Sequence, residues 1–186
     1  MERQKNTQMF VIAILAVAIL TMSVGFAAYT ATLNISGTAN LEKAKWSIVW
    51  DTNSYSPTTG GKAVTVADDK RTFNTTDFTF EVDLKPGEFY EFTINAKNEG
   101  TFDANLKSIT MSDVSAHSDY LKYEVYYNGT KYTASTSGLS TALAAGASAP
   151  VKVRVEYVIP EDSTKLPSEN DVKVNLSASF GYEQAA

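Results

Sequence analysis

The stretch "DFTFEVDLKPGEFYEFTINAKN", residues 77–98, decides the fold class of this chain. Apolar side chains take every second position on both sides of its centre, at Phe78, Phe80, Val82 and Leu84 and then at Tyr90, Phe92, Ile94 and Ala96. This period of two is typical of strands with one buried face. Between the two runs, Pro86 presets φ and Gly87 supplies the positive φ of a tight turn. The stretch therefore predicts two antiparallel strands joined by a short turn.

Similar alternating runs extend outward in both directions. They are "KAKWSIVWD" (43–51), "KAVTVA" (62–67), "ANLKSITMSDV" (104–114), "YLKYEVYYNGTKYTA" (120–134), "VKVRVEYVI" (151–159) and "VKVNLSASFGYE" (172–183). Asn128-Gly129 is a strong hairpin signal within the fourth run. Two segments read as loops, "SYSPTTGGK" (54–62) and "GLSTALAAGASAP" (138–150), the second with a turn of helix as the alternative. Nine or ten short strands without a long helical stripe predict an all-β, antiparallel sandwich of jelly-roll or immunoglobulin-like type.

Composition narrows the function classes. The 186 residues suit one domain plus an apolar N-terminus. The net charge is −5 and the basic residues are scattered, so we expect no nucleic-acid partner. The chain has no cysteine, which excludes disulfides, thiolate catalysis and cysteine-ligated metals.

The N-terminal run "MFVIAILAVAILTMSVGFAA", residues 9–28, carries no charge. About twenty helical residues cross about 30 Å of hydrocarbon, so this apolar helix is expected to enter a membrane. Small residues at Gly25, Ala27 and Ala28 suit a cleaved signal peptide, whereas the length of the run suits a retained anchor. Residues 1–28 are therefore a signal peptide or a membrane-anchor helix. Either role predicts that residues 29–186, a single sandwich domain, lie outside the cytoplasm.

The stretch "YTATLNISGTA", residues 29–39, follows this run directly. Its apolar side chains alternate strictly with polar ones, at Tyr29, Ala31, Leu33 and Ile35. The pattern predicts a half-buried strand. Such a strand can complete the sheet of its own domain or, by strand addition, the sheet of a neighbour.

Candidate catalytic and metal-binding residues are few. Asp113, His117 and Asp119 could be imagined as a metal cluster, but His117 is the single histidine and zinc sites usually take several nitrogen or sulfur ligands. We interpret these residues as a polar loop. Acidic side chains that could collect calcium occur at Asp68, Asp69, Glu161, Asp162, Glu169 and Asp171. Their spacing matches no EF-hand loop, so solvated turns are expected.

Trp46 and Trp50 share one face of a predicted strand. They could form a carbohydrate platform, although aromatic residues at alternate positions more often belong to a sandwich core. No motif of a zinc protease, a serine hydrolase or a P-loop occurs in the sequence. We therefore predict a non-enzymatic protein without catalytic residues, metal or cofactor.

Three stretches together resemble the TasA/camelysin family of exported proteins from Gram-positive bacteria. They are "SVGFAAYTATL" (23–33), "VDLKPGEFYEFTINAKNEGTFDANLKSI" (82–109) and "SASFGYEQAA" (177–186). The resemblance implies cleavage between Ala28 and Tyr29 by a SipW-type signal peptidase and a jelly-roll sandwich. It also implies self-association into extracellular fibres of a biofilm matrix, with residues 29–36 inserted into the next subunit. The donor-strand contacts would be Tyr29, Ala31, Leu33 and Ile35.

Three functions follow as hypotheses. The first is a structural subunit of a cell-surface fibre or matrix, assembling by donation of the N-terminal strand. The second is a membrane-anchored surface adhesin or accessory protein that does not polymerise. The third is an exported hydrolase. Some members of the resembling family are labelled metalloproteases, but this sequence lacks a zinc-protease motif.

Overall fold

The structure is a computed structural model that describes Met9 and residues 11–17, 38, 43–167 and 173–185. It divides into two compact units, residues 1–42 and residues 43–186. In the first unit, Met9 and residues 11–17 are helical, apolar and exposed. Among the described residues, no helix has the length and apolar character needed to cross a membrane.

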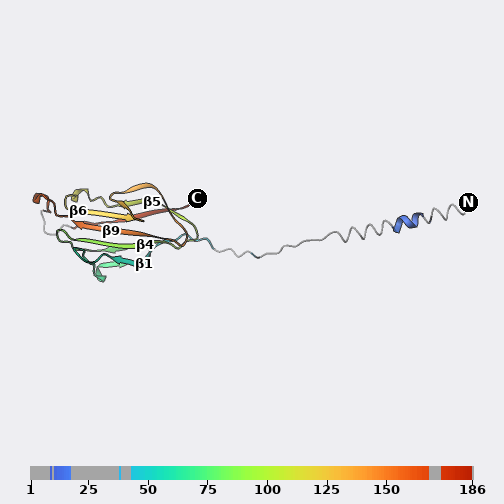
Figure 1. Cartoon of the computed structure of the whole chain (residues 1–186), viewed down its shortest axis with the longest axis horizontal. Coiled ribbons are helices and arrows are strands. Elements are labelled where there is room, and N and C mark those ends of the chain that lie inside the picture. The colour runs from blue at the N-terminus through green and yellow to red at the C-terminus, as the bar shows by residue number, and fades with distance from the viewer. Residues whose placement is uncertain (1–8, 10, 18–37, 39–42, 168–172, 186) are drawn as a thin grey trace. The chain divides into compact units, whose positions relative to one another are not determined.

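The second unit is built on a five-stranded antiparallel sheet (Figure 1). In spatial order its strands are β1 (Ile48–Pro57), β4 (Phe89–Asn98), β9 (Ser148–Tyr157), β6 (Leu121–Tyr127) and β7 (Thr130–Tyr132). A second antiparallel sheet has the order β10 (Ala178–Gln184), β5 (Ala104–Met111) and β8 (Thr136–Leu143). The all-β, antiparallel sandwich predicted from the sequence is therefore confirmed.

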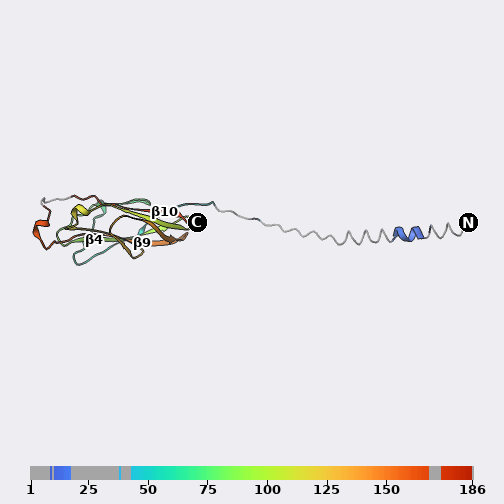
Figure 2. The same cartoon turned by 90° about the horizontal axis from the view of Figure 1, so that it is seen from above.

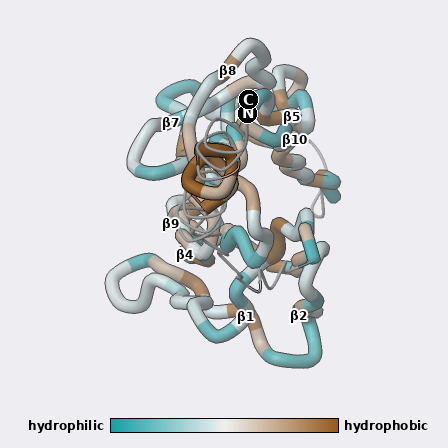
Figure 3. The backbone as a smooth tube through the Cα atoms, turned by 90° about the vertical axis from the view of Figure 1, so that its right-hand side faces the viewer, coloured by the Kyte–Doolittle hydropathy of each residue, from teal (hydrophilic) through white to brown (hydrophobic). Residues whose placement is uncertain are grey.

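The remaining elements are short. β2 (Arg71–Phe73) and β3 (Phe78–Phe80) form a separate two-stranded hairpin. Single 3₁₀ turns are η1 (Asp68–Lys70), η2 (Ser115–His117) and η3 (Ser163–Lys165). Figure 2 shows the same strands from above, and Figure 3 views the sheets end-on, with β4 and β9 on one side and β5, β8 and β10 on the other.

Alternation in the sequence places the core between the sheets. β4 buries every second side chain, and its neighbours β6 and β9 bury theirs on the same face. β5 contributes the facing layer. The fully buried large side chains are Tyr90, Tyr127, Phe92, Ile94, Leu106, Ile109, Val125, Val151 and Asn98. Burial of a large apolar side chain contributes about 1.5–3 kcal/mol, so the apolar side chains among these account for much of the stability.

Both turns predicted from the sequence are confirmed. Gly87 has a φ of 81° in the turn before β4. Asn128 and Gly129 have φ values of 48° and 83° between β6 and β7, as a two-residue hairpin with two positive φ angles requires.

Several predicted boundaries were wrong. The predicted loop 54–62 begins inside β1, which continues to Pro57 through a bulge after Asp51. The predicted loop 138–150 contains most of β8 and the start of β9. β8 is an edge strand whose small Ser, Thr and Ala residues give little hydropathy contrast. The predicted strand 62–67 makes only a single bridge, from Ala63 to Phe89.

The strands of the sandwich run between two ends, a proximal end and a distal end. At the end called proximal, the Lys45 carbonyl accepts a hydrogen bond from the Thr101 amide at 2.9 Å, and Gln184 of β10 pairs with Ala104 of β5. At the opposite end, called distal, the Gly87 amide donates to the Tyr157 carbonyl at 2.7 Å. The chain enters this unit at the proximal end. η3 lies at the distal end (Figure 1).

Candidate functional site: an open groove between β3 and β10

The layer that faces the five-stranded sheet is interrupted. The hairpin of β2 and β3 lies over this sheet, because Phe78 packs edge-on against Phe92 at 4.5 Å between ring centroids and Phe80 lies 5.0 Å from Tyr90. β10 belongs to the same facing layer. Within the described part of the chain, no hydrogen bond joins β3 to β10, which belong to separate sheets. Among the described residues, each of these strands therefore has one unpaired edge, and the two edges border a common groove.

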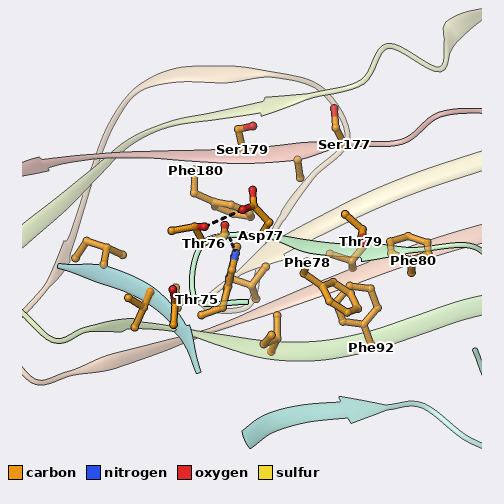
Figure 4. A pocket seen from close by; sticks show the side chains of 18 of the residues that line it. Thr75, Thr76, Asp77, Phe78, Thr79, Phe80, Phe92, Ser177, Ser179 and Phe180 are labelled. Atoms are coloured by element: carbon orange, nitrogen blue, oxygen red, sulfur yellow. Dashed lines mark hydrogen bonds between the residues drawn. The ribbon is translucent and has the colours of Figure 1, made fainter. Parts of the chain in front are cut away.

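The proximal half of the groove is a cavity of about 540 Å³ with an apolar floor. Figure 4 shows Phe180, Ser177 and Ser179 of the β10 segment on one side, with Phe78 and Phe80 opposite them. The floor is supplied by the five-stranded sheet, at Phe92, Ile94, Ala96, Tyr123, Val151 and Val153. The proximal rim is closed by Trp50, whose ring meets Phe180 edge-on at 5.5 Å. These apolar side chains belong to the core and yet border an open cavity.

The distal half is a second cavity of about 590 Å³. Phe80 and Leu176 line both cavities, so the groove is continuous. Here it runs between residues 80–84 and residues 173–176, over Leu121, Val155 and Tyr157. Residues 81–84 and 173–177 were predicted as parts of longer strands, but the structure assigns them to no strand. The sequence pattern was therefore right about their alternation and wrong about their pairing.

The two walls of the groove run in opposite directions. From the proximal to the distal end, residue numbers rise along the β3 wall, from Thr75 to Leu84, and fall along the β10 wall, from Tyr182 to Lys173. One strand laid between them would be antiparallel to one wall and parallel to the other. The β10 wall spans residues 173–182, which at about 3.3 Å per residue gives about 33 Å of groove.

Two tyrosines lie toward the proximal end of the groove. Tyr182 lines the cavity, and the ring centroid of Tyr127 lies 6.4 Å from that of Tyr182. Their buried hydroxyls have no partner of hydrogen-bond geometry among the described residues. Burial raises the pKa of both hydroxyls, and it raises the pKa of Tyr123 on the groove floor to about 12. All three tyrosines are therefore neutral at physiological pH.

The structure does not bring the candidate metal ligands together. His117 Nδ1 lies 2.7 Å from the Tyr120 hydroxyl. The Asp113 carboxylate accepts a hydrogen bond from the Ser115 amide at 2.9 Å, which helps hold its pKa below the ordinary value. Asp119 forms an ion pair with Lys165 at 3.0 Å. Across the described residues, no group of three His, Cys, Asp or Glu side chains could hold a metal ion.

The acidic loop residues have local roles. Asp68 pairs with Arg71, and Asp162 accepts a hydrogen bond from the Thr164 amide at the start of η3. Asp69 and Glu161 are exposed. Glu169 and Asp171 lie outside the described residues.

The prediction that both tryptophans share a strand face and belong to the core is confirmed for Trp50 and wrong for Trp46, which lies outside β1. Trp46 precedes β1 and is 45% exposed, whereas Trp50 packs against Phe180 and donates from its indole nitrogen to the Thr76 carbonyl at 3.1 Å. Trp50 therefore links the turn between β2 and β3 to β1 by a hydrogen bond, and so helps to position the β3 wall of the groove.

The residues predicted for cleavage and strand donation lie outside the described part of the chain. They are Ala28, Tyr29, Ala31, Leu33 and Ile35. The groove itself was not predicted, because alternation along residues 78–84 and 172–182 reveals which side chains are buried but not which backbone edges are paired.

Comparison with known proteins gives no assignment. No protein-family model matches the chain, and no curated protein matches it.

Proposed function

We propose that this protein is an exported subunit of a cell-surface fibre or matrix, in which the N-terminal strand of one copy fills the groove of the next. The groove between β3 and β10 is the observation that carries the proposal. It offers two free backbone edges and an apolar floor, which are the two requirements of strand addition. A donated strand supplies the missing backbone hydrogen bonds, and its alternate side chains fill the pockets.

Residues 29–36 are the proposed occupant. Eight residues of strand span about 26 Å, which fits within the groove. Tyr29, Ala31, Leu33 and Ile35 would face the floor formed by Phe92, Ile94 and their neighbours, while the intervening Thr, Asn and Ser side chains would face solvent. The apolar run at residues 9–28 supports export, and cleavage after Ala28 by a SipW-type peptidase would free the strand. Fibres of a biofilm matrix are the expected product, as the resemblance to the TasA/camelysin family implies.

The proposed assembly can be tested at one inward position. We expect Leu33→Asp in the processed protein to abolish filament formation, because the groove cannot hydrate a carboxylate and burial of an unpaired charge is strongly unfavourable. Asn34→Asp, at the adjacent outward position, is the matched control and should still polymerise. Filament formation is measured by sedimentation and electron microscopy. Full polymerisation of the Leu33→Asp protein would refute strand donation.

A membrane-anchored surface protein that does not polymerise is the second candidate. The charge-free run of residues 9–28 favours it if this run is retained. The N-terminal sequence of the protein from the cell surface separates the two candidates. A chain that begins at Tyr29 supports the fibre subunit, and a chain that begins at Met1 or Glu2 in the membrane fraction contradicts it.

A further inference from the structure

Exposed large apolar side chains gather at the two ends of the sandwich. Within the described residues of the second unit there are four of them, and none lies on the faces of the sheets: Trp46, Phe102, Ile159 and Leu166 are 45%, 38%, 57% and 36% exposed. Trp46 and Phe102 lie at the proximal end, each next to one residue of the hydrogen-bonded pair Lys45 and Thr101. Single exposed apolar residues are ordinary, but a pair at each end of the domain identifies candidate contact surfaces.

The distal pair borders the mouth of the groove. Ile159 follows β9 and approaches the turn at Gly87. Leu166 caps η3 and precedes Pro167, which lines the distal cavity. A strand that leaves the groove at this end therefore passes the distal apolar pair.

The direction of the donated strand follows from the two walls. The regular strand at the edge is longer on the β10 wall, where β10 has 7 residues, than on the β3 wall, where β3 has 3 residues. Antiparallel pairing is slightly more stable per residue than parallel pairing, so the donor should run antiparallel to β10. Because β10 runs from the distal to the proximal end, the donor then has Tyr29 at the proximal end and Ile35 at the distal mouth.

The tether between donor strand and sandwich is short. Eight residues, 37–44, separate the strand from Lys45, and fully extended they reach about 28 Å. This reach is less than the groove length of about 33 Å. A strand in this direction therefore cannot fill the groove of its own copy, and a donor that emerges at the distal mouth of another copy keeps Lys45 of its own sandwich within about 28 Å of that mouth.

We propose that the proximal end of each copy docks on the distal end of the next, with Trp46 and Phe102 against Ile159 and Leu166. The partner is a second copy of this chain, and the proposal rests on the strand donation proposed above. Two different surfaces meet in this contact, so it is heterologous and continues into an open filament rather than closing into a dimer.

Cross-linking through engineered thiols tests this contact directly, since the native chain has no cysteine. Processed Trp46→Cys and Ile159→Cys proteins are copolymerised and then oxidised. We expect disulfide-linked dimers in the mixture, a ladder of oligomers from the double variant, and neither from the single variants. In the control mixture, Tyr126→Cys replaces Trp46→Cys. Tyr126 lies on the outer face of the five-stranded sheet, away from both ends of the sandwich contact, so no cross-link is expected.

Three outcomes contradict the proposal in distinguishable ways. Filaments that form without a cross-link between positions 46 and 159 overturn the end-to-end contact and leave strand donation intact. Dimers from Trp46→Cys alone indicate a closed proximal-to-proximal pair. The absence of filaments from unmodified processed protein overturns strand donation and this contact together.

A second variant tests the apolar contribution. Trp46→Ser combined with Phe102→Ser should raise the protein concentration needed for filament formation by about tenfold or more. A tenfold loss of affinity corresponds to a loss of about 1.4 kcal/mol of binding free energy. Both side chains are exposed, so circular dichroism and thermal unfolding should match the wild type. An unchanged critical concentration would overturn the docking surface.

Discussion

At the scale of the residue, Asn98 shows how one polar side chain fixes the proximal end. It is fully buried, and its amide nitrogen donates to the carbonyls of Phe102 and Leu143 at 2.8 and 3.1 Å. Its side-chain oxygen accepts from the Gly100 amide at 2.9 Å. One side chain thus joins β4, the turn after it and β8.

Asn98→Ala should lower the free energy of unfolding by about 3 kcal/mol, because buried backbone groups lose their partners. Asn95→Ala, on the half-buried outer face of the same strand, is the matched control and should cost less than about 1 kcal/mol. Urea unfolding measures both. Equal losses for the two variants would contradict this role of Asn98.

Some features of single residues could be predicted from the sequence, and others could not. Gly87 and the Asn128-Gly129 pair were predicted correctly because a positive φ strongly restricts residue choice. The role of Asn98 was not predicted, since nothing local distinguishes a buried asparagine at the end of a strand from an exposed one.

At the scale of the element, β4 and β9 are joined on their outer face by charged side chains. Arg154 and Lys152 of β9 lie 3.2 and 3.6 Å from the Glu91 carboxylate of β4, and the Thr58 hydroxyl donates to the same carboxylate at 2.9 Å. Partial burial raises the pKa of Glu91, but the hydrogen bonds and the two cations outweigh it and hold the pKa below the ordinary value of 4.5. The ionised form therefore stabilises the pairing of these strands.

The ion pairs of Glu91 with Arg154 and Lys152 predict a pH dependence of stability. Because the folded-state pKa of Glu91 is lowered, its contribution to stability is present above the ordinary pKa of 4.5 and is lost as the pH falls through the folded-state value. The free energy of unfolding of the wild type should therefore fall more steeply between about pH 5 and pH 2 than that of Glu91→Gln. Denaturant unfolding across this range measures the difference. Parallel curves for the two proteins would contradict the assignment.

The strands in which apolar and polar side chains alternate most strongly were also the strands predicted best. β4, β6 and β9 carry large side chains on one face and polar ones on the other, so periodicity identified them. β8 was missed because its inward positions include Thr136 and Thr141 beside Leu139 and Leu143, which weakens the contrast. The pairing of β10 with β5 and its separation from β3 depend on backbone partners far along the chain, which periodicity does not record.

At the scale of the whole molecule, the groove is the feature on which the proposed strand donation depends. The layer over the five-stranded sheet is divided by a groove between β3 and β10, and its floor is the hydrophobic core. Filling the groove with residues 29–36 would complete this layer between β3 and β10. The order of the completed layer would be β2, β3, donor, β10, β5 and β8.

The decisive measurement for strand donation is the structure of the assembled filament, determined by cryo-electron microscopy on processed protein. We predict a strand between β3 and β10 of every subunit, formed by Tyr29 to Ser36 of the neighbouring copy and antiparallel to β10. Leu33 and Ile35 should face the apolar floor. A filament in which this groove is empty, or is filled by residues of the same copy, would refute donation of the N-terminal strand to a neighbour.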